Sequence, residues 1–170
     1  MVIGLYEFLL KVSKLKKTQE KVDALRYNDS LPLRIILQGA FDPTVEFLLP
    51  EDEPPYKPNE IVDQQHVLIK ECEKIRYFVK GFHPTLNQNK REMMFIEMLE
   101  RVDPQDAKLL VAIKNKKLPF PGITIQHVVE ALPGLIPEEN LKLYKPTRNR
   151  SVKEEAEEDL SGTEDEQEQH

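Results

Sequence analysis

The sequence predicts an all-α fold, with one compact helical domain over residues 1–145 and an acidic tail over residues 146–170. Apolar residues recur at the three- and four-residue spacing of helices, whereas the alternating pattern of strands is essentially missing. Several segments open on a capping residue and close on proline or glycine. With 39% hydrophobic and 32% charged residues, the 170-residue chain has the composition of one globular domain. The tail is expected to be disordered, because it has too few apolar residues to fold.

Three helices are predicted within residues 1–41. The first covers residues 2–15, where apolar residues lie at near-helical spacing: Ile3, Tyr6, Leu10 and Val12. Thr18 can cap the second helix, which carries Val22, Leu25 and Arg26. Asp29 or Ser30 caps the third, with Pro32 in its first turn. This third helix is predicted to bury Leu33, Ile36, Leu37 and Ala40.

The middle of the chain is predicted to hold a long helix over residues 62–80, ending at Gly81. Its apolar residues fall at positions i, i+4, i+7 and i+11: Leu68, Cys72, Ile75 and Val79. The single cysteine is therefore expected to be a buried, inert thiol. Before this helix, residues 45–49 are predicted to form a short helix. The proline-rich acidic segment 50–60 is predicted to be an extended surface loop.

Three further helices are predicted. The first covers residues 90–102 and places Met94, Phe95, Met98, Leu99 and Val102 on one face. Asp103 caps the next, with Pro104 at its first position, and this helix is expected to direct inward Ala107, Leu110 and Val111. Thr124 caps the last helix, which runs to about Leu132 and ends at Pro133-Gly134.

Catalytic and metal-binding patterns are lacking in the sequence. The four histidines form no metal-binding helical pair, and no serine or threonine lies in a nucleophile elbow. The six glycines do not cluster into a phosphate loop. We therefore expect a binding protein and not an enzyme, without a metal or cofactor. The apolar run near the N-terminus is too short for a signal peptide or membrane span, which predicts a soluble, cytoplasmic protein.

Charge is divided unevenly along the chain. Residues 151–170 contain nine acidic residues and one lysine, which leaves 21 acidic and 23 basic residues in the rest of the chain. The overall net charge of -6 therefore hides a mildly basic body. A basic body can contact nucleic acid, whereas a tail of this kind is solvated.

Grouped basic residues near the last predicted helix indicate a phosphate-binding surface. Lys114, Lys116 and Lys117 precede the start of that helix at Gly122, Ile123 and Thr124. Free backbone N–H groups at a helix start bind anions, and a glycine lets a phosphate approach closely. Lys80, Lys90 and Arg91 are expected to add support. The alternative is an ordinary solvated face, which counts of charge alone would favour.

Asp106 to Glu139, "DAKLLVAIKNKKLPFPGITIQHVVEALPGLIPEE", resembles the end of the N-terminal DNA-binding domain of the ATP-dependent DNA ligase of T-even-type bacteriophages. The front segments "FLLKVSKLKKTQEKVDALRYN" and "LPLRIILQGAFDPTVEFLLP" follow the order of that domain's opening helices, so the resemblance spans roughly residues 5–139. It implies a domain that grips duplex DNA near a nick and can contact the sliding clamp. By position, Gly122, Ile123 and Thr124 match the turn and helix start that face DNA. The adenylation motif Lys-x-Asp-Gly is missing, so ligase activity is not expected.

The chain before the tail also resembles a family of small proteins of T-even-like phages, including those infecting cyanobacteria, for which no activity is established. Segments of the types "YFVKG", "KREMMFIEMLE" and "ITIQHVVEALPGLIP" carry this resemblance. It implies a viral origin and a location in the cytoplasm of an infected bacterium.

Three functional hypotheses follow. The first is a stand-alone, monomeric module that binds duplex or nicked DNA through phosphates, with little base readout. The second is an adaptor that docks on replication or transcription machinery, such as a sliding clamp or polymerase, and the acidic loop and tail favour it. A third, weaker hypothesis is that the tail mimics DNA or folds back on the basic face, against the commoner role of a solubilising tail.

Overall fold

The computed structural model describes residues 3–145, and this part of the chain is all-helical and compact. It opens with α1 (Leu5–Ser13), α2 (Thr18–Tyr27) and α3 (Leu31–Phe41). After a long loop come α4 (Gln65–Glu71), the 3₁₀ helix η1 (Cys72–Phe78), α5 (Gln88–Arg101) and α6 (Pro104–Lys114). The chain continues through α7 (Ile125–Ala131) and the short α8 (Glu138–Leu141). The all-α fold class is confirmed, while the predicted tail, residues 146–170, lies outside the described residues.

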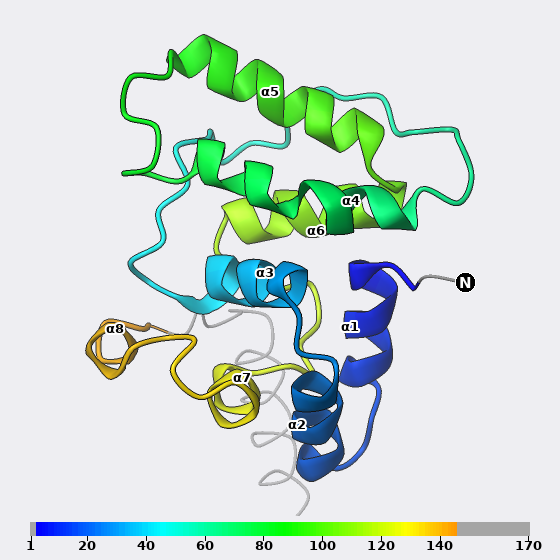
Figure 1. The fold of residues 1–170 in the computed structure, drawn as a ribbon, viewed down its shortest axis with the longest axis vertical. Helices are drawn as coiled ribbons and strands as arrows, with labels where there is room; N and C mark the ends of the chain where they lie inside the picture. Colours follow the sequence, from blue (N-terminus) through cyan, green and yellow to red (C-terminus); the bar gives the residue numbers. More distant parts are fainter. Residues whose placement is uncertain (1–2, 146–170) are drawn as a thin grey trace, which may run out of the picture.

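The helices pack as two halves on either side of α3 and α1 (Figure 1). One half comprises α4, η1, α5 and α6, and the other comprises α2, α7 and α8. α6 contacts α1, α3 and α5, and α2 packs along α7, so one core runs through both halves. Its fully buried side chains include Leu9, Ile36, Leu99, Leu109 and Val128.

Most predicted helix starts are confirmed by their capping contacts. Ser30 accepts a hydrogen bond from the Leu33 N–H at 3.4 Å, and Asp103 accepts one from the Gln105 N–H at 3.0 Å. Pro104 is the first residue of α6, where its missing N–H costs nothing. The prediction for Thr18 was wrong, because α2 begins at Thr18 and Lys17 holds the N-cap position without a side-chain hydrogen bond.

Residues 45–49 do not form the predicted helix. They are extended, and Phe47 pairs with Val79 in an antiparallel bridge. The Leu48 N–H donates to the Phe78 carbonyl at 2.8 Å, and the Lys80 N–H donates to the Glu46 carbonyl at 2.9 Å. Helical periodicity in so short a segment is a weak signal, and pairing with a segment distant in sequence overrides it.

The same bridge shortens the helix that was predicted over residues 62–80. The helical segment begins at Gln65, changes to 3₁₀ geometry at Cys72 and ends at Phe78, because Val79 is drawn into extended pairing. Cys72 is 3% exposed, which confirms the buried thiol. Burial, with Glu73 as a smaller cause, raises the pKa of that thiol, which keeps it protonated and unreactive.

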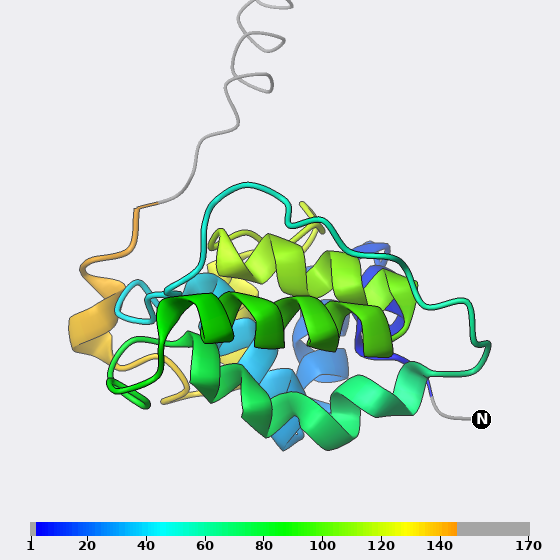
Figure 2. The same ribbon diagram turned by 90° about the horizontal axis from the view of Figure 1, so that it is seen from above.

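The extended loop 50–60 is confirmed, and the helical body holds it in place. Lys57 donates from its backbone N–H to Glu100 at 3.0 Å, and the Asn59 side chain donates to the Arg101 carbonyl at 2.8 Å. Figure 2 shows this loop running alongside α6. The loop is therefore a fixed surface strip, not a detached linker.

The segment after α7 turns sharply and returns to the core. Gly134 has a φ of 82°, a left-handed conformation that glycine adopts without strain. Leu135 and Ile136 are then buried, with 9% and 5% of their surfaces exposed. The helix α8, which was not predicted, follows directly. None of the helices within residues 3–145 is long and apolar enough to cross a membrane.

Candidate functional site

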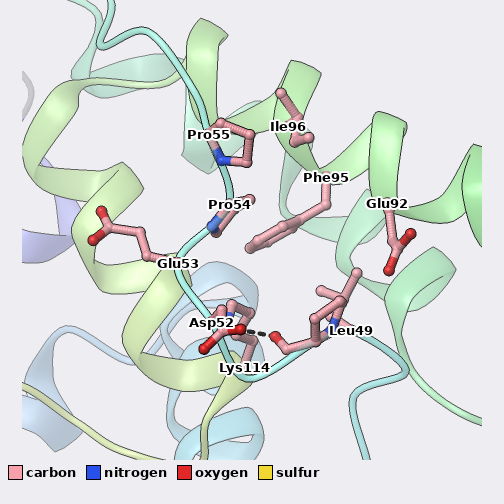
Figure 3. A pocket seen from close by; sticks show the side chains of 10 residues that line it. Leu49, Asp52, Glu53, Pro54, Pro55, Glu92, Phe95, Ile96 and Lys114 are labelled. Carbon is pink, nitrogen blue, oxygen red and sulfur yellow. Dashed lines mark hydrogen bonds between the residues drawn. The ribbon is translucent and has the colours of Figure 1, made fainter.

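Lys114, at the end of α6, lies under the acidic loop and not on an open face. Only 6% of the residue is exposed. Its Nζ donates to the Pro50 and Glu51 carbonyls at 2.8 and 2.9 Å, and Figure 3 shows Lys114 next to Asp52 of the loop. Burial lowers the pKa of Lys114, while the neighbouring acids Asp52, Glu51 and Glu53 act in the opposite direction. Its ammonium group therefore fastens the loop and is already occupied.

Lys116 binds carbonyl groups at the C-terminal end of α3. Its Nζ donates to the Gly39 carbonyl and, at 2.7 Å, to the Asp42 carbonyl, and lies 5.8 Å from the centre of the Phe47 ring. These carbonyls belong to the negative end of a helix, which favours a cation. Burial lowers the pKa of Lys116 to about 8, with Asp42 opposing the shift. This lysine is a structural cap.

Arg91 is also structural. It is 5% exposed, and its guanidinium donates to the carbonyls of Tyr77 and His83 at 3.0 and 3.2 Å and to Gln88 at 2.6 Å. It thereby holds the loop between η1 and α5. The remaining predicted lysines, Lys80, Lys90 and Lys117, are exposed, and Lys80 forms an ion pair with Glu46 at 3.5 Å.

Gly122, in the predicted anion seat, packs against the end of α1. A Cβ at Gly122 would lie 2.4 Å from the Ser13 carbonyl oxygen, so the close contact with α1 requires a glycine here. Lys21 donates to the Gly122 carbonyl at 2.6 Å, and Ile123 is a core residue with 4% of its surface exposed. A helix as short as α7 also offers little dipole.

Thr124 is exposed, and its own backbone N–H is taken by a hydrogen bond within α7. The Thr124 N–H donates to Nδ1 of His127 at 3.0 Å. Burial lowers the pKa of His127, and Lys21 acts in the same direction, so the neutral imidazole can accept this bond. The sequence correctly placed Thr124 at the helix start, whereas the imidazole partner came from the structure.

A second group of lysines, which the sequence reasoning missed, lies next to this turn. Residues 11–21, here called the lysine turn, join α1 to α2 and contain Lys11, Lys14, Lys16, Lys17 and Lys21 against one acid, Glu20. The Ser13–Gly122 contact and the Lys21 bond bring the lysine turn beside residues 122–124. A count of charge in a sliding window would have found this group.

The lysine turn is open to solvent. Lys11, Lys14, Lys16 and Lys17 are exposed. Lys11 forms an ion pair with Glu7 at 3.3 Å, and within the described residues no carboxylate lies within ion-pair distance of Lys14, Lys16 or Lys17. Residues 3–145 bring together no group of three metal-ligating side chains.

Comparison with known proteins identifies a family. The family described as "Family of unknown function (DUF6433)" matches residues 8–119, about two thirds of the chain. The match includes the lysine turn and ends before Gly122. No curated protein and no solved structure matches the chain significantly. The chain therefore belongs to the family of unknown function DUF6433.

Proposed function

We propose that the chain is a non-catalytic module that binds duplex or nicked DNA through backbone phosphates, in phage DNA metabolism. The observation that carries the proposal is the lysine turn, where Lys14, Lys16 and Lys17 are exposed without an acidic partner in the described residues and the turn contacts Gly122. Each lysine that meets a phosphate releases condensed counterions, so a few contacts give a sequence-independent affinity. The resemblance of residues 106–139 to a ligase DNA-binding domain supports the same reading.

The proposed surface differs from the one expected from sequence. Lys114, Lys116 and Arg91 donate to backbone carbonyls, so we assign them to the support of the fold and leave them out of the proposed contact. Lys80 follows η1, and Lys90 lies in α5. Both elements belong to the half of the molecule that lies across α3 from α2 (Figure 1). The lysine turn thus replaces them as the centre of the contact.

The test is fluorescence anisotropy with labelled intact duplex, nicked duplex and single strand, each over a salt series. The triple variant Lys14→Glu, Lys16→Glu, Lys17→Glu is expected to bind at least about tenfold more weakly at low salt. It should also reduce the slope of log affinity against log salt by about 3, because three phosphate contacts are lost. A chain ending at Arg150 is expected to bind more tightly than the full chain, because it lacks the acidic segment.

The matched control carries the same charge change at exposed lysines elsewhere: Lys57→Glu, Lys70→Glu, Lys142→Glu. It should retain most of the affinity. Equal losses in both triple variants would show a response to net charge only, and the lysine turn would not be the site. If neither the full nor the shortened chain binds DNA at low salt, the proposal is wrong.

An adaptor that docks on a sliding clamp or polymerase is a second proposal, and the fixed acidic loop favours it. Glu51, Asp52 and Glu53 are exposed on a strip that Lys114 and Asn59 fasten to the helices. A fixed row of carboxylates repels DNA and suits a basic protein surface.

Purified clamp and polymerase of a T-even-type phage, immobilised without DNA, test the adaptor proposal. The full chain is expected to bind one of them, and the variant Glu51→Lys, Asp52→Lys, Glu53→Lys should bind at least about tenfold more weakly. The control Glu97→Lys, Glu138→Lys, Glu139→Lys should bind as the unmodified chain does. Undiminished binding by the loop variant would remove the loop from the interface.

A further inference from the structure

An apolar groove runs along the outer face of α3. It encloses about 410 Å³ between α3, η1 and the turn after α7. One row of α3 side chains forms a wall, with Leu31 and Ile35 as its apolar members. Phe82 and Leu31 stand at the groove with 57% and 48% of their surfaces exposed. We propose that this α3 groove binds residues 152–160 of the chain's own acidic tail, a contact that does not depend on DNA binding.

Charge distinguishes the α3 groove from two other hollows of the described structure. Its charged lining residues are Arg34 and Arg76, and it has no acidic lining residue. The hollow beneath the loop, drawn in Figure 3, is lined by Asp52, Glu53 and Glu92. The hollow above Lys116 sets Glu46, Glu51 and Asp52 against three lysines, Lys114, Lys116 and Lys117. An acidic segment would be repelled from the first hollow and would find mixed charges in the second, whereas the charged side chains that line the α3 groove are all positive.

The two arginines differ in how fully they are engaged. Arg34 donates two hydrogen bonds to Asp29, at 2.6 and 2.7 Å. Arg76 is exposed, and its guanidinium lies 5.9 Å from the centre of the Phe82 ring. Within residues 3–145 no carboxylate lies at ion-pair distance from Arg76. Arg76 therefore offers a cation beside an apolar surface.

The tail sequence has the complementary chemistry. Val152, Ala156 and Leu160 recur every four residues, a spacing that places side chains on one side of a helix. The positions between them hold five of the tail's acids: Glu154, Glu155, Glu157, Glu158 and Asp159. One apolar row flanked by carboxylates suits an apolar floor flanked by arginines.

The chain also leaves the described structure near the groove. Gly134 and Leu135 line the groove, and α8 and Tyr144 follow, with the Tyr144 ring 6.4 Å from that of Phe41 at the end of α3. Val152 follows Lys145 by seven residues, a span of up to about 25 Å. A segment tethered this closely has an effective concentration in the mM range, so even a weak contact is populated.

The test is methyl NMR of the full chain and of a chain ending at Arg150. Removal of the tail is expected to shift the methyl resonances of Leu31, Ile35, Val79 and Leu135 and to leave those of the α5–α6 core in place. A synthetic peptide of residues 151–170, added to the shortened chain, should restore the shifts saturably. Arg76→Glu should lower the affinity for this peptide at least about tenfold. Leu31→Asp, which places a charge in the apolar wall of the groove, should lower it to a similar extent.

Both substituted residues are exposed, so the variants should fold, and Lys90→Glu in α5 is the matched charge control. A peptide with Glu157→Lys, Glu158→Lys and Asp159→Lys should bind the Arg76→Glu variant better than it binds the unmodified groove. Three results would overturn the proposal: no shift at the groove, shifts at the lysine turn instead, or shifts that grow with protein concentration, which would assign the groove to the tail of a second copy.

Discussion

At the scale of single residues, the most unusual group is the carboxylate of Asp106 in α6. It is 1% exposed, and one oxygen accepts the Tyr6 N–H at 3.0 Å, which caps the start of α1 from a distant helix. Its other oxygen has no hydrogen-bond partner within the described residues. Burial, the largest cause, raises the pKa of Asp106 to about 6 from an ordinary value of 3.8, although the Tyr6 bond opposes the shift.

Because the pKa of Asp106 is raised in the folded state, we expect its contribution to the free energy of unfolding to fall as the pH rises. The folded state keeps the proton on Asp106 up to about pH 6, whereas the unfolded chain releases it near pH 4. The contribution of Asp106 to the free energy of unfolding is therefore greatest below pH 4 and decreases between pH 4 and pH 6. The full shift corresponds to about 3 kcal/mol. Asp106→Asn keeps an acceptor for Tyr6 without the charge, so it should be about 2 kcal/mol more stable than the unmodified chain at pH 8 and similar at pH 4.

Urea unfolding of both proteins at several pH values measures the difference between their free energies of unfolding. The contributions of the other titrating groups are common to both proteins and cancel in this difference. Asp23→Asn, at an exposed carboxylate, is the control and should show no comparable trend. If the Asp106→Asn variant were less stable than the unmodified chain at pH 8, the buried carboxylate would be contributing to stability and the prediction would be wrong.

At the scale of elements, basic side chains stabilise the structure by binding carbonyl groups at helix ends and in loops. Lys114 fastens the acidic loop, Lys116 caps α3, and Arg91 holds the segment between η1 and α5. These carbonyls lie in irregular backbone or at a helix end, where the regular pattern of helix hydrogen bonds is incomplete. The Asp42 and His83 carbonyls also accept one local backbone N–H each, from Val45 and Leu86. The elements are therefore joined by side chains as well as by the apolar core.

Lys114→Met is expected to release residues 50–60 while leaving the helices in place. The methionine keeps much of the buried stem, but the Pro50 carbonyl loses its donor and the Glu51 carbonyl keeps only the Asn115 side chain, at a cost of about 1–3 kcal/mol. Hydrogen exchange should become faster within residues 50–60 and unchanged in α5. Lys117→Met, at an exposed lysine, is the control and should alter neither. Unchanged exchange in the loop would show that Asn59 and Lys57 suffice to hold it.

At the scale of the whole molecule, the candidate site arises where segments a hundred residues apart meet. Lys21 and Gly122, separated by 101 positions, bring the lysine turn beside the start of α7. The resemblance to a ligase domain pointed to residues 122–124, and the structure places beside them lysines from the front of the chain. The opposite charges of the body and the tail are likewise a property of the whole chain. We propose that they attract each other at the groove along α3.

The sequence by itself determined the all-α class, most helices with their Ser30 and Asp103 caps, and the buried Cys72. These follow from spacing and from contacts within a few residues. Only the tertiary structure decided that residues 45–49 are extended, and which cations remain available for binding. The physical reason is that the partners of Lys114 and Lys116 lie 64 and 74 positions away, so grouping in sequence could not distinguish a buried cap from an exposed charge.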